Sequence, residues 1–362
     1  MAGEFEKENE GERTMKAAVL FANQDIRYAD YPTPAVKPGT VKIHVKVCGI
    51  CGSDVPRVLS NGAHFYPIVL GHEFSGIVEE VGEGVTKVQK GDTVSCAPLI
   101  PCNHCEDCAQ GHYSLCKHYS FIGSREQGGM AEYVVIPEAN VVPYDPSIPF
   151  TTAALFEPAT VALHGVFCNG FQGGGDVAVL GCGTIGIFTV EWARLLGAKR
   201  VVAFDIDDNR LSLAKRVGAE VGVNTLAKDY DRQVADLTEG RGFDYVFEAA
   251  GNPSTIKLAF EIAGNKSHVC CIGTPHADVL FSPSLWEQMN RKEFLLTGSW
   301  MSYSAPFPGK EWQLCQQYMQ TGEFKFDPAI IYKTYPFKDV GKAFAEYLHP
   351  QNVHGKIMLL NL

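Results

Sequence analysis

The stretch Val177-Ala-Val-Leu-Gly-Cys-Gly-Thr-Ile-Gly186 decides the fold of this chain. Its apolar start, Val177 to Leu180, predicts a short buried strand, and residues Ile185 to Leu196 predict a helix that ends at Gly197. Glycines between such a strand and helix make a tight turn, let the backbone approach a pyrophosphate and allow close packing. The first amide groups of the helix then donate hydrogen bonds to phosphate. The stretch therefore predicts a dinucleotide-binding unit.

An acidic residue supports this interpretation. Asp205 follows Gly186 by nineteen residues and ends the next predicted strand, Val201–Phe204. A carboxylate there accepts hydrogen bonds from the ribose hydroxyls and repels a ribose phosphate, so we expect NAD rather than NADP. The alternative role, a helix-initiating acid, is already filled by Asp207 and Asp208. The predicted cofactor contacts are Gly181, Gly183, Thr184, Ile185, Gly186, Asp205 and Arg210.

The pattern of predicted secondary structure changes near Phe150. Before it, segments such as 41–47, 76–81 and 131–136 predict short strands of a β-rich, barrel-like domain. After it, apolar strands alternate with helices, which predicts a parallel sheet covered on both faces. Residues 300–336 are expected to form turns and short elements, before a helix and a final strand near 356–360. The predicted α/β organisation is a mobile acidic tail (1–14), a β-barrel domain (15–160 and 300–362) and a nucleotide-binding domain (161–299).

Composition limits the partners of the protein. The formal net charge is −10, with 46% hydrophobic and 20% charged residues, as in ordinary globular enzymes. No basic stripe exists to neutralise phosphates, so we expect no nucleic acid. The sequence contains no run of about 18 apolar residues, so we expect no membrane span. The first fourteen residues lack the apolar core of a secretory signal. These observations favour a cytoplasmic location.

Four of the twelve cysteines are crowded together, at Cys102, Cys105, Cys108 and Cys116. Four thiolates at this spacing can close a tetrahedral shell around one zinc ion within a single loop. A closed shell leaves no position for a substrate, so this site is expected to be structural. The alternative is a set of reduced or disulfide-bonded cysteines.

A second candidate metal set is dispersed over three motifs. These are Cys51-Gly-Ser-Asp54, Gly71-His-Glu73 and Glu157-Pro158. Each alone is weak evidence, because a lone Cys or His is usually structural and a Glu before Pro usually begins a helix. Together, a thiolate, an imidazole and a carboxylate form the mixed ligand set of an open catalytic zinc.

Taken together, the dispersed ligand motifs, the four-cysteine cluster and the glycine-rich stretch, in their order along the chain, resemble the zinc-containing medium-chain dehydrogenase/reductase family. The resemblance runs from Met15 onward. The segment Gly71-His-Glu-Phe-Ser-Gly76 is part of that resemblance. It implies a GroES-like β-barrel catalytic domain and a Rossmann doubly wound domain, with the active site between them. It also implies NAD and two zinc ions, one catalytic and one structural.

The resemblance assigns roles residue by residue. It implies that Cys51, His72 and Glu157 bind the catalytic zinc and that Glu73 can exchange into the shell. Asp54 would orient His72. It further implies that Ser53 takes the substrate proton. Because Pro56 stands where relatives often have a relay histidine, the onward proton path stays open.

Glu157 indicates the substrate class, since polyol dehydrogenases of this family have glutamate where alcohol dehydrogenases usually have cysteine. Three further segments, 51–64, 121–125 and 298–312, resemble the polyol-phosphate branch. We therefore expect oxidation of a polyol, or of a polyol phosphate resembling galactitol 1-phosphate, to the ketose. Candidate substrate contacts are Arg57, His64, Arg125, Trp300 and Tyr303.

Three alternatives remain open at this point. The first is an unphosphorylated polyol substrate such as sorbitol or xylitol, and the second is the amino alcohol threonine. A chain that binds NAD without catalysis, as a structural or regulatory protein, is a third. Edge strands near 268–272 or 294–298 favour a homodimer or homotetramer.

Overall fold

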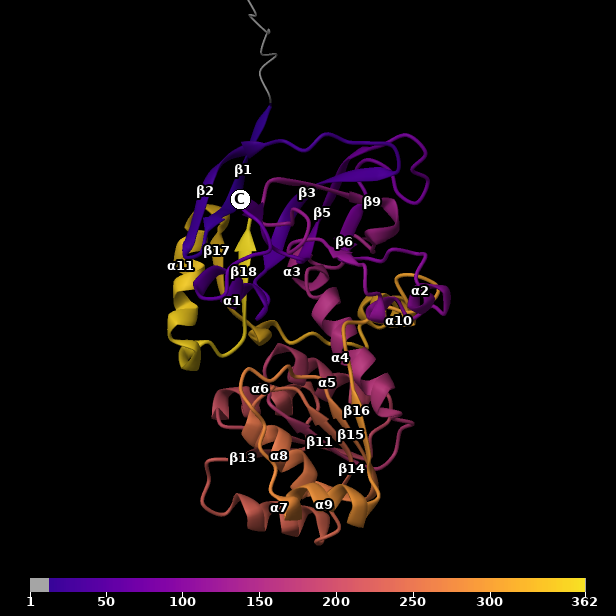
Figure 1. Cartoon of the computed structure of the whole chain (residues 1–362), viewed down its shortest axis with the longest axis vertical. Coiled ribbons are helices and arrows are strands. Elements are labelled where there is room, and N and C mark those ends of the chain that lie inside the picture. The colour runs from indigo at the N-terminus through magenta and orange to yellow at the C-terminus, as the bar shows by residue number, and fades with distance from the viewer. Residues whose placement is uncertain (1–12, 362) are drawn as a thin grey trace, which may run out of the picture.

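The computed structural model describes residues 13–361, which form two bodies joined by the long helix α4 (Phe156–Asn169) (Figure 1). The predicted mobile tail lies outside the described residues except for Arg13 and Thr14. Thr14 already begins strand β1 (Thr14–Ala22). Over residues 13–361, no helix combines the length and the apolar character needed to cross a bilayer.

The first body is β-rich. Its main sheet, within the described residues, has the order β10-β6-β5-β3-β18-β17, with β9 also paired to β3. Along β3 (Thr40–Gly49) buried residues such as Val41, Ile43 and Val45 alternate with more exposed ones, as expected for a strand with one face on the core. The other strands of this body are β1, β2 (Asp25–Pro32), β4 (Ile68–Val69), β5 (Glu73–Val81), β6 (Thr93–Cys96), β7 (Leu99–Ile100), β8 (Ser120–Phe121), β9 (Tyr133–Pro137), β10 (Val141–Pro143), β17 (Ile331–Pro336) and β18 (Lys356–Leu360).

The second body is a parallel sheet of order β13-β12-β11-β14-β15-β16. Numbered along the chain, this order is 3-2-1-4-5-6, the dinucleotide-binding topology. Val177 and Val179 of β11 belong to one hydrophobic cluster, and Ala178 and Leu180 to another. Because strand side chains alternate, these two clusters cover opposite faces of the sheet. The strands are β11 (Asp176–Leu180), β12 (Arg200–Asp205), β13 (Val221–Asn224), β14 (Phe243–Glu248), β15 (Ala263–Cys271) and β16 (Leu295–Gly298).

The helices follow the expected pattern. Those of the second body are α5 (Thr184–Leu195), α6 (Asp208–Val217), α7 (Tyr230–Thr238), α8 (Pro253–Ile262) and α9 (Pro283–Lys292). The remaining α-helices are short, apart from α10: α1 (Asp54–Leu59), α2 (Glu106–Ala109), α3 (Phe150–Ala153), α10 (Lys310–Gln320) and α11 (Val340–Ala345).

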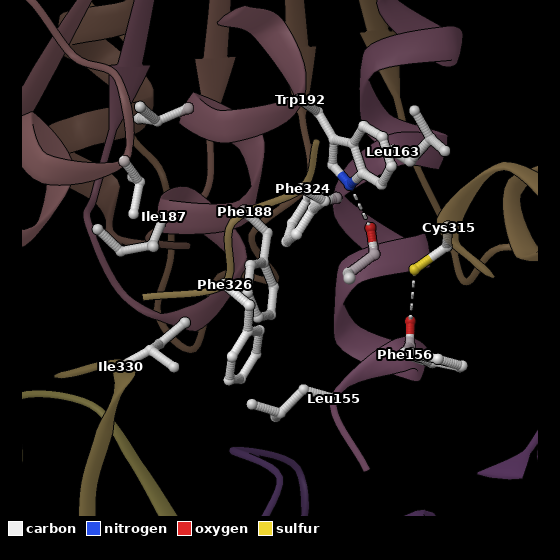
Figure 2. Close-up of a cluster of buried hydrophobic side chains, with 14 of the residues drawn as sticks. Leu155, Phe156, Leu163, Ile187, Phe188, Trp192, Cys315, Phe324, Phe326 and Ile330 are labelled. Carbon is white, nitrogen blue, oxygen red and sulfur yellow. Dashed lines mark hydrogen bonds between the residues drawn. The ribbon is translucent and has the colours of Figure 1, made fainter. Parts of the chain in front are cut away.

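Helix α4 is held by a core that draws on both bodies (Figure 2). The indole N–H of Trp192, on α5, donates to the carbonyl oxygen of Ala159 at 2.9 Å. Phe324, from the segment after α10, packs on the Trp192 ring with centroids 4.6 Å apart. The N-terminal turn of α4, which carries Glu157, therefore rests on a rigid base.

The expectation of turns and short elements over residues 300–336 was wrong in one place. Residues Lys310–Gln320 form the 11-residue helix α10, which packs on α4. Trp312, Cys315 and Met319 are its buried apolar face. Their spacing of three and four residues is helical, a signal that the aromatic character of the surrounding sequence obscured.

Candidate active site

A cavity of about 450 Å³ lies where the β-barrel, α4 and the glycine loop meet. The barrel contributes Cys51, His72 and Glu73, while α4 contributes Glu157. Gly183, Thr184 and Ile185 of the glycine loop line the same cavity. The structure thus brings the dispersed ligand candidates next to part of the predicted cofactor loop.

Three of the candidate metal ligands are already clustered. Ligand atoms of Cys51, His72 and Glu73 all lie within 4.8 Å of one another. Glu157 lines the cavity without belonging to that tight set. Burial raises the pKa of Glu157 to about 7, although the charge of His72 opposes this shift. Burial also raises the pKa of the Cys51 thiol.

This donor set fits a zinc ion. Sulfur, imidazole nitrogen and carboxylate oxygen are the ligands that zinc prefers, and a buried group of them is costly without a cation. The residues present therefore match the metal that the sequence predicts.

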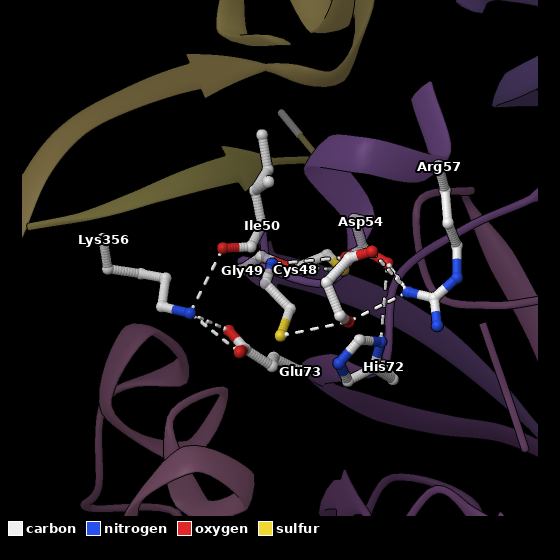
Figure 3. A network of polar contacts seen from close by, with 10 residues as sticks. Cys48, Gly49, Ile50, Asp54, Arg57, His72, Glu73 and Lys356 are labelled. Carbon is white, nitrogen blue, oxygen red and sulfur yellow. Dashed lines mark hydrogen bonds and ion pairs between the residues drawn. The ribbon is translucent and has the colours of Figure 1, made fainter. Parts of the chain in front are cut away.

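Glu73 has a partner that the sequence analysis missed. The Lys356 ammonium donates to both carboxylate oxygens of Glu73, at 2.7 and 2.6 Å, and to the Ile50 carbonyl at 3.2 Å (Figure 3). Both side chains are buried. Gly49 faces Glu73 across the sheet, and a Cβ atom there would lie 2.5 Å from a Glu73 carboxylate oxygen. Glu73 is thus held by a lysine that begins strand β18.

Asp54 lies behind the ligand set, fully buried (Figure 3). One carboxylate oxygen accepts the backbone N–H of Cys51 at 3.2 Å. The other lies 3.7 Å from His72 Nδ1 and 3.4 Å from the Arg57 guanidinium. Burial raises the pKa of Asp54, while the His72 and Arg57 charges partly offset that effect. The position suits the predicted role of orienting His72.

Ser53 and Arg57 are in direct contact. The Ser53 hydroxyl donates to the Cys51 sulfur at 3.4 Å and accepts from Arg57 at 2.9 Å. Arg57 also donates to the Ser53 carbonyl at 2.7 Å. The hydroxyl predicted to take the substrate proton therefore lies between the metal ligand and a cation.

The predicted substrate contacts separate into two groups. Arg57, His64, Arg125 and Trp300 line the cavity. Burial lowers the pKa of His64, and the charges of Arg125 and Arg57 lower it further. Tyr303 does not line this cavity, since it is 1% exposed and stacks on Trp312 with ring centroids 5.8 Å apart. The ring of Tyr303 is thus part of the hydrophobic core and not of the cavity wall.

The four-cysteine lobe is formed as the spacing predicts. The sulfur atoms of Cys102, Cys105, Cys108 and Cys116 lie within 4.8 Å of one another, around the short helix α2. The backbone N–H of Cys102 also points at the Cys116 sulfur, at 3.4 Å. Four sulfurs at this distance fit one tetrahedral zinc.

The glycine loop has the shape of a cofactor cradle. A Cβ atom at Gly186 would lie 1.7 Å from the Gly181 carbonyl oxygen, so close packing requires glycine there. At Gly183 the same test meets nothing within 4 Å, which leaves the backbone open to a pyrophosphate. These features match the group that the sequence predicts.

The predicted ribose-binding residues lie together at the end of β12. Asp205 accepts the backbone N–H groups of Cys182 (2.6 Å) and Asp207 (3.0 Å). Arg210 lies 3.9 Å from Asp205 and donates to the carbonyl oxygen of Val353 at 2.6 Å. Arg210 thus links the second body to the segment that precedes β18.

Comparison with known proteins points the same way. Residues 37–146 match the family model described as alcohol dehydrogenase GroES-like domain, and residues 184–317 match the one described as zinc-binding dehydrogenase. Galactitol 1-phosphate 5-dehydrogenase of Escherichia coli strain K12 is 38% identical over 347 residues, 96% of this chain and 100% of the relative. An L-threonine 3-dehydrogenase of Symbiobacterium thermophilum is 37% identical over 72% of this chain and 76% of its own length.

Solved structures agree with the fold. The crystal structure of galactitol-1-phosphate dehydrogenase from Escherichia coli superposes with a TM-score of 0.90 at 37% identity, covering 96% of this chain and 100% of that one. A GroES-like barrel with a Rossmann body is therefore the architecture of both chains.

Proposed function

This chain belongs to the zinc-containing medium-chain dehydrogenase/reductase family, in its polyol branch, and from that premise we propose that it oxidises a secondary alcohol of a polyol phosphate to the ketose, with NAD as the hydride acceptor. The observation that carries the substrate proposal is the presence of two cations, Arg57 and Arg125, together with His64 in the cavity that holds the candidate metal ligands. A phosphomonoester needs such donors, and an arginine supplies two parallel ones. The name of the Escherichia coli relative indicates the same substrate class.

The cofactors supply the reactive groups, and the chain positions them. When bound by Cys51, His72 and Glu157, zinc supplies a Lewis acid that lowers the pKa of the substrate hydroxyl. NAD on the glycine loop supplies the hydride acceptor. Ser53 accepts the proton of the substrate hydroxyl and passes its own proton on, so it remains neutral, and the Arg57 guanidinium, 2.9 Å from its oxygen, fixes the orientation of this hydroxyl.

The test is a panel of galactitol, sorbitol, xylitol and arabitol, each with and without a terminal phosphate, assayed by NAD reduction. We expect at least a hundredfold higher kcat/KM for one phosphorylated member, since two charge-assisted contacts supply about 3 kcal/mol. Equal rates on free polyols would place the enzyme with sorbitol-type dehydrogenases. Turnover of threonine alone would favour the amino-alcohol alternative, for which the Symbiobacterium relative is the reason.

Arg125 provides the sharper variant, because Arg57 also holds Ser53. We expect Arg125→Gln to raise KM for the phosphorylated substrate by about 10- to 100-fold and to leave the free polyol unchanged. Arg241→Gln is the matched control, since that side chain is 70% exposed and does not line the cavity.

The cofactor preference and the assembly state belong to the same proposal. Asp205 favours NAD, and we expect Asp205→Ser to raise the NADP-to-NAD ratio of kcat/KM. The outer strand β16 exposes Leu295 and Leu296, which supports a homodimer or homotetramer through that edge. Sedimentation showing only monomer at micromolar concentration would exclude the oligomer.

A further inference from the structure

A second cavity of about 510 Å³ lies beside the candidate active site. The two cavities share four lining residues, Ile272, Thr274, Ser299 and Trp300, so one wall separates them. The second cavity is also lined by helix α4 and by residues 111, 112, 114 and 115 of the four-cysteine lobe. Leu115, Pro275 and Trp300 give part of its lining an apolar character. Nothing in the proposed dehydrogenase reaction uses it.

A nucleophile and a base face this cavity from one helix. His164 and Cys168 are four residues apart on α4, so they lie on the same face, and both line the cavity. The imidazole of His164 and the thiol of Cys168 are therefore neighbours on the helix surface, about one turn apart. The Nδ1 atom of His164 pairs with a carboxylate oxygen of Glu311 at 2.8 Å. A thiol, an imidazole and a carboxylate in this sequence are the parts of an activated cysteine.

The carboxylate of this trio is firmly placed. Glu311 is 1% exposed, and its second oxygen accepts the Ser304 hydroxyl at 2.9 Å. Gly309 makes room for it at a φ of +129°, since a Cβ atom there would lie 2.8 Å from that oxygen. Glu311 therefore fixes the orientation of the His164 ring.

The surroundings of His164 favour the charged form of its imidazole. Burial lowers the pKa of His164, but contacts with Cys168 and Glu311 outweigh burial and raise that pKa to about 9. An imidazolium beside a cysteine stabilises its thiolate. Burial raises the pKa of Cys271, another thiol of the same cavity, to about 11. Cys168 is thus the thiol with a cationic neighbour.

We propose that Cys168 is a thiol-exchange site, activated by His164 and Glu311, through which small apolar disulfides inhibit the enzyme. The Cys168 sulfur attacks one sulfur of the disulfide, so that a new S–S bond forms as the old one breaks. The leaving thiolate takes the proton that His164 holds, and Cys168 ends as a mixed disulfide beside one free thiol. Cys168 is oxidised and the small disulfide is reduced, so no further reactant is needed.

The shared wall explains the expected inhibition. A group added to Cys168 enters the second cavity, whose wall at Ile272 and Trp300 also lines the candidate active site. Ile272 already packs closely on helix α4, since a Cβ atom at Gly165 would lie 2.3 Å from its side chain. A shift of Ile272 away from the added group would therefore be directed toward the candidate active site. This part rests on the proposed dehydrogenase function, whereas the thiol exchange does not.

The experiment treats the zinc-loaded full chain with the apolar reagent 4,4′-dithiodipyridine and follows release of its coloured thiol. Peptide mass mapping then identifies the labelled cysteine in the wild-type protein. This part of the test does not depend on whether a variant folds. Cys168→Ser and His164→Gln are the test variants. Cys271→Ser is the matched control, and the doubly charged reagent 5,5′-dithiobis(2-nitrobenzoate) tests the apolar character of the cavity.

We expect a fast phase that labels Cys168, is absent in Cys168→Ser and is about tenfold slower in His164→Gln. The control variant and wild type should react alike, and the charged reagent should react slowly. Labelling should lower polyol oxidation in wild type but not in Cys168→Ser, and dithiothreitol should restore it. A fast phase that maps to another cysteine, or a His164→Gln rate equal to wild type, would overturn the site. Full activity of the labelled enzyme would overturn the inhibition alone.

Discussion

The two candidate metal-ligand clusters of this protein are built in opposite ways. The four-cysteine lobe takes its ligands from one loop, Cys102 to Cys116. The cavity takes Cys51, His72 and Glu73 from the barrel and Glu157 from α4. The ligands of the lobe are thus assembled once its own loop has folded. Those of the cavity are assembled only when the barrel sheet and α4 are both in place. Local clusters support stability, whereas dispersed ones respond to the whole fold and suit catalysis.

Electrostatics separates the clusters as well. In the lobe, hydrogen bonds from backbone N–H groups, that of His104 first, lower the pKa of Cys102 to about 6. Burial and neighbouring thiols raise the pKa of Cys108 to about 12, so the lobe holds one thiol with a lowered pKa and one with a raised pKa. At the cavity, burial first and then the Glu73 charge raise the pKa of Cys51. The thiols of the lobe thus differ among themselves in pKa, whereas the single thiol of the cavity has a raised one.

The largest contrast is expected from His72→Asn. Loss of this ligand should lower kcat by at least about a thousandfold, because the Lewis acid is lost, while the melting temperature changes little. Metal analysis should show one zinc per chain instead of two. His44→Asn, on the neighbouring strand β3, is the control. Retained activity in His72→Asn would remove the cavity from catalysis.

The converse variant is Cys105→Ser in the lobe. We expect a loss of about 2–5 kcal/mol of stability, seen by thermal unfolding, because the loop loses its cross-link. At temperatures below the transition, kcat per folded molecule should stay near the wild-type value. Glu106→Gln, exposed in the same loop, is the matched control. A selective loss of kcat without destabilisation would contradict the division of roles.

Asp54→Asn tests the support of the dispersed cluster. Replacing a carboxylate behind a metal-binding histidine typically costs about 10- to 100-fold in metal affinity or activity. We expect this loss in kcat/KM and in zinc affinity together, measured by titration with a zinc chelator. Unchanged zinc affinity would show that Asp54 does not orient His72.

The smallest effect concerns the pH dependence of metal binding. Metal binding displaces ligand protons, so a raised pKa weakens binding as the pH falls. The lobe has four thiols to deprotonate, whereas the cavity has one thiol besides Glu157, so the zinc affinity of the lobe should fall more steeply between pH 8 and pH 6 than that of the cavity. Cobalt absorption bands distinguish a four-sulfur site from a mixed one. An equal fall in the two affinities would contradict the comparison.

Much of the fold was accessible from sequence because its signals are local. The strand, glycine loop and helix around Gly181 were predicted as they occur, and so were Asp205 at the end of β12 and the final strand β18. The four-cysteine cluster was predicted for the same reason, since its ligands share one loop. For the dispersed set, the residues alone left the question open, and the family resemblance supplied the assignment.

The errors and omissions concern contacts between distant segments. Lys356 was missed because nothing near it in sequence indicates that β18 places it against Glu73. Tyr303 was predicted to contact the substrate because the sequence of an aromatic segment does not show which of its rings is buried in the core. Arg57 was expected at the substrate, and its contact with Ser53 depends on the first turn of α1.

The position of β18 has a consequence for synthesis on the ribosome. This strand pairs with β3, more than three hundred residues earlier, and carries the lysine that neutralises Glu73. A nascent chain therefore has a complete glycine loop and a complete four-cysteine lobe well before its barrel sheet can close. Until residue 356 leaves the exit tunnel, Glu73 lacks its cation, and the newborn enzyme is expected to be inactive.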